Sequence, residues 1–256
     1  RNNKWETYSM GPKTSPVGEL IGFDVRYEAG EPVFVIATSE NGILINEKSH
    51  WRMIRHPLTR PGGYISGMIR TGASYFLASN QGVFKLENGV VNPLTEINQQ
   101  LPDQTLVAIS VTEKCGPKGP ENRIWLLGKH WIGFVQQGKF SLLASGFPMT
   151  NDTSYQTGVI CASERGNVYF GNRFQLFYCN ENNPVPQKLG REEGLTGEGA
   201  LALMVDREKN TWIGGLRGLA CIPFTRFINL NMSDGLYDNE VSSALEIRPG
   251  EYVFGH

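Results

Sequence analysis

The sequence predicts an all-β fold, a β-propeller of four-stranded antiparallel blades with about six repeat units visible and the last incomplete. A short phrase recurs, made of an aromatic residue, two apolar residues and a small one, slightly shifted in two repeats. The small residue stands at positions 37, 78, 128, 171, 215 and 255, at spacings of 41, 50, 43, 44 and 40. A period of about 40–45 residues built from strand-like segments is typical of propeller blades. The 30 glycines and 13 phenylalanines suit many short strands and tight turns.

Each repeat resolves into short strands separated by turn residues. The predicted units lie near 10–56, 57–98, 99–145, 146–191, 192–233 and 234–256, within one propeller over residues 1–256. The first three units have expected strands at 33–37, 43–46 and 51–54; at 65–69, 75–78, 83–86 and 90–94; and at 106–111, 124–127, 132–135 and 140–143. The last three have 158–162, 167–170, 175–178 and 187–189; 200–205, 211–213, 219–222 and 226–230; and 242–247 and 251–254.

Two segments carry particular expectations. Asn41-Gly42 is a strong hairpin signal, because both residue types tolerate positive φ. Residues 115–122 are rich in Gly and Pro, and we expect them to form an insertion between the first two strands of the third unit. This insertion would account for the longest spacing in the repeat.

The sixth unit has no outer strands, and residues 4–8 are similar to the outer strand of a blade whose earlier strands are missing. An unclosed propeller leaves unpaired sheet edges, which natural proteins normally protect or eliminate. Either the two ends pair to close a ring, or the chain is part of a longer blade array. The missing third strand of unit six favours the longer array.

Composition excludes some functions. The formal net charge is −1, with 24 basic and 25 acidic residues and no Lys/Arg block, so no nucleic-acid partner is expected. No apolar run approaches the ~20 residues that span a bilayer. The chain shows no signal peptide and begins with Arg1, so we expect a processed or excised piece.

The four cysteines, at 115, 161, 179 and 221, allow a disulfide interpretation. The predicted blade argues against it for Cys161 and Cys179, which would lie in the first and third strands of one sheet. Strands in a sheet are about 4.8 Å apart, so two strand spacings exceed disulfide reach. Free, buried thiols are the favoured prediction.

Residues 192–256 carry the most detailed motif. They include Asp-Arg-Glu-Lys-Asn-Thr-Trp-Ile-Gly at 206–214, Arg-Gly-Leu at 217–219 and Asp-Gly-Leu-Tyr-Asp-Asn-Glu-Val at 234–241. This stretch resembles the two-component-regulator propeller repeat, strongly in units five and six and more weakly elsewhere. Gly215 replaces the usual Thr, and Arg-Pro-Gly at 248–250 replaces the usual Asp-containing turn.

That resemblance implies a location and a parent protein. Proteins similar to this repeat are typically bacterial sensors whose propellers lie outside the cytoplasmic membrane, followed by a small β-sandwich, a membrane helix and a histidine kinase or diguanylate cyclase. It therefore implies a periplasmic, ligand-sensing or dimerising region of a membrane-anchored parent, with a homodimer as one arrangement. The output domains are not in this sequence.

No catalytic constellation is visible. His50, His56, His130 and His256 have no second His or Cys at metal-ligand spacing, so we expect no metal site. No P-loop, G-x-S-x-G or dinucleotide fingerprint occurs. Asp206 and Asn210 are interpreted as bracketing a tight turn, and Trp212 as packing against the next blade. We expect neither a catalytic residue nor a cofactor.

A binding site can be placed by propeller geometry. The loops from second to third strand and from one blade to the next share one face around the axis. Aromatic residues beside cations on that face suit sugars, carboxylates or peptide backbones. The candidate ligand-binding residues are Lys129, His130, Trp131, Arg173, Phe174 and Arg217.

The preferred function is thus a non-catalytic sensor propeller whose ligand is a small molecule or an oligosaccharide. Two alternatives belong to other classes. A propeller enzyme acting on polysaccharide, either a lyase or a glycosidase, would need convergent carboxylates in the central funnel. A protein-interaction scaffold would bind a stable protein partner and no small ligand.

Overall fold

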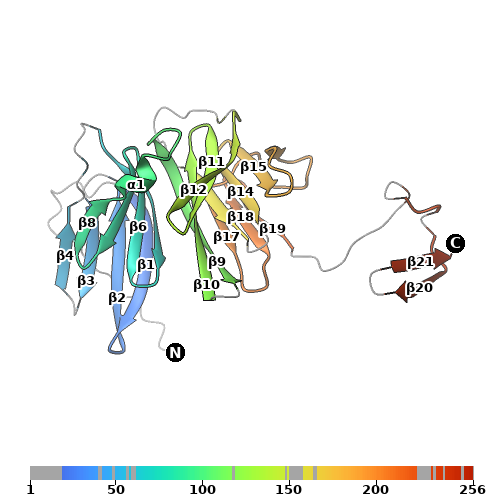
Figure 1. Cartoon of the computed structure of the whole chain (residues 1–256), viewed down its shortest axis with the longest axis horizontal. Coiled ribbons are helices and arrows are strands. Elements are labelled where there is room, and N and C mark those ends of the chain that lie inside the picture. The colour runs from blue at the N-terminus through green and yellow to red at the C-terminus, as the bar shows by residue number, and fades with distance from the viewer. Residues whose placement is uncertain are drawn as a thin grey trace. The chain divides into compact units, whose positions relative to one another are not determined.

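A computed structural model describes residues 19–39, 42–47, 50–55, 58, 62–116, 119–147, 149, 158–163, 166–223, 232, 235–238, 240–248 and 251–255. In these residues the fold consists of strands in antiparallel sheets together with one turn of α-helix, α1 (Thr95–Asn98) (Figure 1). The chain divides into two compact units, Arg1–Ile222 and Pro223–His256. Because each unit is compact by itself, they are described separately.

The described residues of the first unit form four four-stranded sheets and one three-stranded sheet, each a blade with its strands in chain order. Blade 1 contains β1 (Leu20–Glu28), β2 (Glu31–Thr38), β3 (Gly42–Glu47) and β4 (His50–Ile54). Blade 2 contains β5 (Ile65–Thr71), β6 (Ser74–Ser79), β7 (Gly82–Glu87) and β8 (Val90–Pro93). Blade 3 contains β9 (Leu106–Gly116), β10 (Gly119–Gly128), β11 (Trp131–Gln136) and β12 (Lys139–Ser145). Blade 4 contains β13 (Val159–Ala162), β14 (Asn167–Asn172), β15 (Gln175–Asn180) and β16 (Gln187–Leu189). Blade 5 contains β17 (Ala202–Val205), β18 (Thr211–Gly215) and β19 (Gly218–Ile222).

The second unit contains one hairpin, formed by β20 (Ser243–Arg248) and β21 (Glu251–Gly255). The predicted all-β propeller of four-stranded blades is therefore confirmed, and each described sheet lies inside one predicted repeat unit. The strand expected at 226–230 and the strand-like segment at 4–8 lie outside the described residues.

Three local expectations need correction. The strand Leu20–Glu28 and the helical turn α1 were not predicted. The proposed insertion at 115–122 is wrong, because β9 and β10 continue through it as a long hairpin in which Cys115 pairs with Pro120. The extra length of unit three therefore extends its first two strands.

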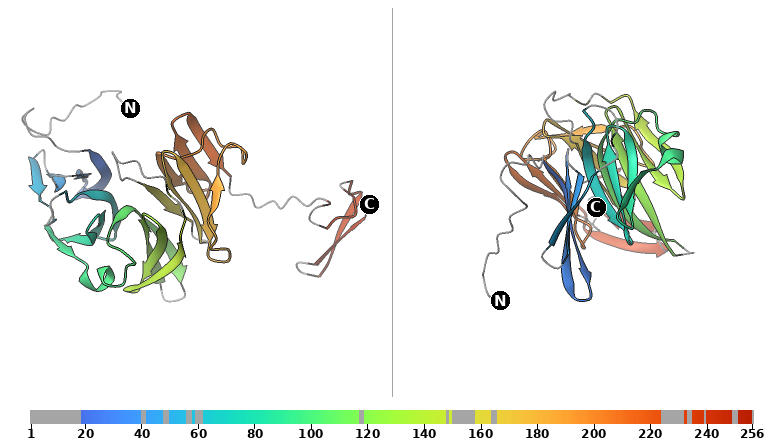
Figure 2. Two further views of the ribbon diagram at one scale, coloured as in Figure 1. Left: turned by 90° about the horizontal axis from the view of Figure 1, so that it is seen from above. Right: turned by 90° about the vertical axis from the view of Figure 1, so that its left-hand side faces the viewer.

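The first strand of every blade in this unit lies on the inside. β1 packs beside β5, β5 beside β9, β9 beside β13 and β13 beside β17. Figure 2 shows the sheets of this unit following one another around an arc. The inner strands thus share a hub, and the turns that connect second to third strands lie at the same end as the connections between blades.

The core lies between successive blades. Side chains alternate across a strand, so each sheet presents two faces. Here the leading face of a blade is the one toward the preceding blade, and the trailing face is the one toward the next. Between blades 1 and 2, Val33 and Val35 of the trailing face pack with Tyr75 and Leu77 of the leading face. Similar apolar clusters join blades 2 and 3, 3 and 4, and 4 and 5.

The motif turn in blade 5 is built around one carboxylate. Asp206 accepts hydrogen bonds from the Asn210 backbone N–H at 2.8 Å, the Asn210 amide at 3.0 Å and the Trp212 indole N–H at 2.7 Å. The indole hydrogen bond is the main reason that the pKa of Asp206 lies below its ordinary value. The expected bracketing of this turn by Asp206 and Asn210 is confirmed.

The described cysteines are free. Cys161 and Cys179 are buried in the first and third strands of blade 4, and Cys221 is exposed in β19. Burial raises the pKa of the Cys161 thiol to about 12 and that of Cys179 to about 11, so both stay protonated at neutral pH. The side chain of Cys115 lies outside the described part of the structure.

Replacing Phe170 by Ala should destabilise the first unit by about 3–5 kcal/mol, because the ring is fully buried and its loss leaves a cavity. The ring lies 4.9 Å from the Phe147 ring, between blades 3 and 4. Urea unfolding followed by tryptophan fluorescence measures the loss. Leu142→Ala is the control, since Leu142 is 51% exposed and should change the midpoint little. Equal effects of the two substitutions would contradict the interblade core.

Asp206→Asn should make the stability less sensitive to acid. A carboxyl whose folded-state pKa is depressed stabilises the fold above its unfolded-state pKa, ordinarily 3.8, and this stabilisation is lost as pH falls through the folded-state value. The urea midpoint of the wild type should therefore fall more than that of Asp206→Asn as the pH is lowered from 5 to below the ordinary pKa of 3.8. Glu192→Gln, at an exposed carboxyl, serves as the control and should behave as wild type.

Candidate functional site

Five of the six candidate residues occupy equivalent turns. Lys129 and His130 are the two residues between β10 and β11, and Arg173 and Phe174 are the two between β14 and β15. Arg217 is the second residue between β18 and β19. These are the turns from second to third strand in blades 3, 4 and 5. The sequence thus predicted their equivalence correctly, while ligand binding by them stays a prediction.

Trp131 is different, because it is the first residue of β11 and is only 3% exposed. Its indole N–H donates to Asp103 Oδ2 at 2.8 Å, and its ring meets the Phe140 ring edge-on at 5.4 Å. The indole lies over Gly128, where any Cβ would collide with it. Trp131 therefore packs in the core between blades 2 and 3 and offers no surface to a ligand in this structure.

Arg173 and Phe174 form a pair on the blade 4 turn. The Arg173 guanidinium carbon lies 4.7 Å from the centre of the Phe174 ring, in a cation–π contact. Both residues are exposed, Phe174 by 40%. The turn therefore presents a cation supported by an aromatic ring.

Asn172 shapes that turn. Its Oδ1 accepts hydrogen bonds from the backbone N–H groups of Phe174 at 2.9 Å and Gln175 at 3.0 Å. Its backbone carbonyl accepts from the Ala200 N–H at 2.8 Å, which ties the turn to the connection between blades 4 and 5. Gly199 packs so closely on the turn that a Cβ would collide with the backbone of Arg173.

Side chains at the same register position support two other turns. The Thr38 hydroxyl donates to the Gly42 carbonyl at 2.9 Å, and the Ser79 hydroxyl donates to the Gly82 carbonyl at 2.9 Å. A short polar side chain at the end of the second strand therefore recurs in blades 1, 2 and 4. Such side chains commonly fix tight turns, so the sequence held a signal that could have identified Asn172.

A cavity of about 290 Å³ opens where the inner strands begin. It is bordered by the start of β1, by β5, by the segments that enter β13 and β17, and by the blade 4 turn. Of the six candidate residues, Arg173 alone lines it. The described residues around the cavity are Glu19, Leu20, Ile21, Ser66, Gly158, Val159, Asn172, Arg173, Ala200 and Leu201.

The cavity combines exposed aliphatic surface with a few fixed polar groups. Leu20 is 61% exposed and Leu201 52% exposed, which is unusual for leucines beside a hub. Ser66 is 5% exposed, and its hydroxyl donates to the Leu106 carbonyl at 2.8 Å. Glu19 and Arg173 supply one group of each charge. Such a lining suits a small ligand with an apolar part and one or two polar groups.

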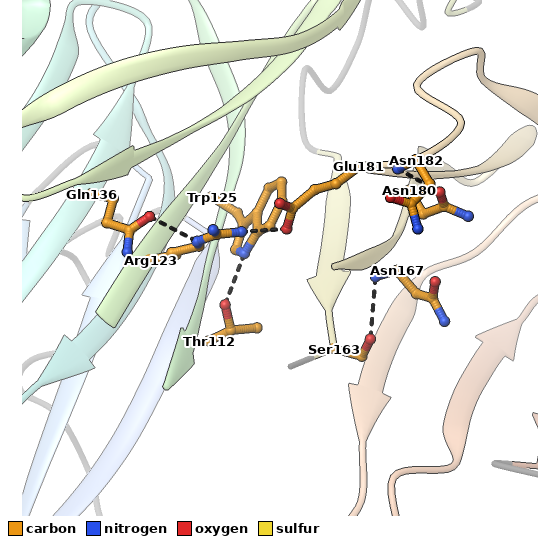
Figure 3. Close-up of polar contacts among 9 residues, drawn as sticks. All are labelled: Thr112, Arg123, Trp125, Gln136, Ser163, Asn167, Asn180, Glu181 and Asn182. Atoms are coloured by element: carbon orange, nitrogen blue, oxygen red, sulfur yellow. Dashed lines mark hydrogen bonds and ion pairs between the residues drawn. The ribbon is translucent and has the colours of Figure 1, made fainter. Parts of the chain in front are cut away.

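A second polar cluster lies between blades 3 and 4 (Figure 3). It is at the ends of β10 and β15 that are farther from the turns between second and third strands. Arg123 forms an ion pair with Glu181 and donates from Nε to Gln136 Oε1 at 2.9 Å. Its guanidinium also lies over the Phe134 ring, 4.6 Å from the centre. Nearby, the Trp125 indole donates to the Thr112 hydroxyl at 2.9 Å. The ion pair of Arg123 with Glu181 joins blade 3 to blade 4, and the other three contacts lie within blade 3, so we assign this cluster a structural role.

No group of three or more His, Cys, Asp or Glu side chains in the described part could hold a metal ion. No helix among the same residues combines the length and apolar character needed to cross a bilayer.

Comparisons with known proteins bear on the fold. No family profile matches the chain, and no curated protein sequence matches it. Among solved structures, it is similar to the extracellular domain of the hybrid two-component system BT3049 from B. thetaiotaomicron, at 13% identity and a TM-score of 0.52. That match covers 94% of this chain and 33% of the other.

The extracellular domain of the one-component system BT4673 from the same organism matches at 14% identity and a TM-score of 0.44, over 97% of this chain and 38% of that one. The chain thus spans 33% and 38% of the length of these two solved domains. The likeness to BT3049 shows that the chain has the propeller fold, which is also the fold implied by the repeat motif.

Asn172→Ala should destabilise the protein by about 1–2 kcal/mol, because two backbone N–H groups lose their acceptor. Asn172→Asp keeps an acceptor oxygen at the same position and should restore most of the loss. Thermal unfolding monitored by circular dichroism compares the two. Equal destabilisation by Ala and Asp would show that this hydrogen bonding does not hold the turn.

Proposed function

We propose that this chain is a non-catalytic, ligand-sensing propeller from the periplasmic region of a membrane-anchored bacterial signal-transduction receptor. The ligand is a small molecule or an oligosaccharide, and the cavity at the hub is its site. The observation that carries the proposal is the composition of this cavity, whose walls come from blades 1, 2, 4 and 5. A ligand there contacts blades far apart in the sequence at the same time.

Two observations support the sensing role. The repeat motif at 206–214 and 234–241 resembles that of bacterial sensor propellers. The propeller of BT3049, which has the same fold, belongs to the extracellular domain of a hybrid two-component system. The same two observations support an extracytoplasmic location for this chain.

The enzyme alternative has less support. Glycosidases commonly use two carboxyl groups that flank the bond to be cleaved. Among the described residues that line the cavity, Glu19 is the one carboxylate. The cavity also holds Arg173, which suits recognition of an anionic or hydroxyl-rich ligand through directional hydrogen bonds. Binding without turnover is therefore the better interpretation.

Ligand binding at the hub would stabilise the arrangement of the blades. A ligand that binds only the folded state raises its stability by RT ln(1 + [L]/Kd), which is about 2.7 kcal/mol at a hundredfold excess over Kd. Because the cavity wall comes from four blades, this stabilisation would act on their mutual packing. That coupling provides a physical route from ligand occupancy to a signal.

The proposal is tested by a thermal-shift screen of oligosaccharides and carboxylated metabolites. The strongest hit should bind Arg173→Ala about 10–100-fold more weakly, the range expected for loss of a hydrogen bond from a charged group. Leu201→Arg, which would fill the cavity, should also weaken binding. Isothermal titration calorimetry measures both affinities.

Arg217→Ala is the matched control. Arg217 occupies the equivalent turn in blade 5 but does not line the cavity, so its loss should leave the affinity unchanged. Equal weakening by Arg217→Ala would place the ligand along the turns instead of in the cavity. A screen without hits, with a protein partner captured instead, would favour the scaffold alternative.

A further inference from the structure

The cavity at the hub is lined by one charged side chain of each sign, and the two come from different blades. Glu19 stands directly before β1 in blade 1, and Arg173 is on the turn from second to third strand in blade 4. Blades 2 and 3 lie between these two blades along the arc (Figure 2). β1 packs beside β5, whereas β13 packs beside β9 and β17. A carboxylate and a guanidinium therefore border one space from separate parts of the hub.

Hydrogen bonds hold the backbone that carries Glu19. Its N–H donates to Ser39 Oγ at 3.0 Å, and its carbonyl accepts from the Ser39 N–H at 2.9 Å. The Ser39 carbonyl accepts in turn from the Ile65 N–H at 2.9 Å, at the start of β5. The carboxylate thus extends from backbone that is tied to the turn of blade 1 and, through that turn, to blade 2.

Arg173 is supported in a comparable way. Its turn is tied to the connection between blades 4 and 5 by the hydrogen bond from the Ala200 N–H to the Asn172 carbonyl at 2.8 Å. Its guanidinium lies over the Phe174 ring, 4.7 Å from the centre. Groups that are positioned before a ligand arrives lose less conformational freedom on binding. Both charged groups are therefore partly pre-organised.

Apolar side chains accompany the two charges in the same lining. Leu20 follows Glu19 directly, and Leu201 follows Ala200, the residue that is bonded to the blade 4 turn. Val159 and Ile21 add half-buried aliphatic surface. Covering apolar surface contributes about 25 cal/mol per Å². An aliphatic group of a ligand would therefore be stabilised between the charges.

The two charges discriminate between classes of ligand. A ligand that is only anionic and pairs with Arg173 brings its charge toward the Glu19 carboxylate, and a ligand that is only cationic has the converse problem. A neutral sugar would displace water from both charged groups without supplying an ionic partner to either, which is costly. A ligand that carries an ammonium group and a carboxylate supplies a partner to each.

The size of the cavity limits the ligand further. Its volume of about 290 Å³ is at the lower end of the range of about 300–1,000 Å³ that is usual for small-molecule sites. A molecule with few heavy atoms fits such a space. An oligosaccharide of several rings would extend beyond it.

We infer that the hub cavity binds a small zwitterion with an aliphatic part, namely a free α-amino acid or a short aliphatic peptide. The ligand's ammonium group donates to the Glu19 carboxylate, and its carboxylate accepts from the Arg173 guanidinium, so both hydrogen bonds are charge-assisted. The aliphatic part covers Leu20 and Leu201. The inference rests on the proposed function in taking the cavity as the ligand site, and it specifies the class of ligand.

A series of three ligands with one branched carbon chain tests the inference on the 256-residue protein. L-leucine carries both charges, 4-methylpentanoate lacks the ammonium group, and 3-methylbutylamine lacks the carboxylate. Isothermal titration calorimetry should give leucine an affinity at least about tenfold higher than that of either analogue, because each analogue loses one charged hydrogen bond. The dipeptide Leu-Leu is measured beside leucine, and the tighter of the two identifies a free amino acid or a peptide as the source.

Glu19→Gln supplies the matching change in the protein. It should weaken leucine binding about 10–100-fold while leaving the affinity for 4-methylpentanoate unchanged, so the preference for leucine is lost. Glu31→Gln is the control, since Glu31 is an exposed carboxylate at the start of β2 and does not line the cavity. Circular dichroism establishes that both variants are folded.

The contrary results are distinct from one another. Equal affinities for leucine and 4-methylpentanoate would mean that the cavity recognises an anion, which overturns the inference. Equal weakening by Glu19→Gln and Glu31→Gln would show a general effect of charge and would overturn it as well. An oligosaccharide whose binding requires Arg173, in a protein that binds neither leucine nor Leu-Leu, would overturn the inference and leave the proposed function standing. The absence of any ligand, here and in the thermal-shift screen, would contradict both.

Discussion

Burial on both sides of each sheet is the constraint on which the first unit depends. A strand exposes alternate side chains on opposite faces, and in blades 2 to 4 both faces carry large apolar residues. A sheet of this kind is not stable alone, because each buried apolar side chain contributes about 1.5–3 kcal/mol only if a neighbour covers it. Successive blades provide that cover, and their inner strands meet at a hub as a consequence.

The constraint also determines what the hub can do. The apolar packing lies between the blades and does not involve the ends of the inner strands. These ends therefore line the cavity at the hub with backbone groups and a few side chains. Interblade hydrogen bonds fix these ends, including Gly158 N–H to the Val107 carbonyl at 2.8 Å and Ser66 Oγ to the Leu106 carbonyl at 2.8 Å. The cavity is therefore pre-formed by the same packing that stabilises the blades.

The sequence predicted the repeat, the fold and the turns well, because strand alternation and turn residues are local signals. The sequence did not predict the strands whose formation depends on contacts with other strands or blades. The strand Leu20–Glu28 contains Asp24 and Arg26, which weaken its apolar pattern, yet both contact Tyr75 of blade 2, Asp24 by a hydrogen bond and Arg26 by a cation–π contact. The segment 115–122 contains turn formers, but Cys115 pairs with Pro120 and Gly116 with Gly119 as parts of two long strands.

Part of the candidate site could also be predicted, because turn residues are local signals in the sequence. Equivalent turn positions follow from the repeat, so Arg173 could be selected from the sequence. Trp131 could not be separated from its neighbours, since only the fold shows that its indole covers Gly128 and bonds Asp103. The cavity itself had no sequence signal, because Leu20, Ser66 and Leu201 come together only when the inner strands do.

Under the proposed function, the position of the cavity would link stability to sensing. Its walls come from the beginning of blade 1 and from blades 2, 4 and 5, so relative movement of these blades would change its dimensions. A ligand shifts such an equilibrium only by its difference in affinity between the two arrangements. Packing within each blade interface resists bending, whereas the hub is held by single hydrogen bonds such as that from Ala200 to Asn172. If the cavity binds a ligand as proposed, small rotations between blades are the motion that its occupancy would control.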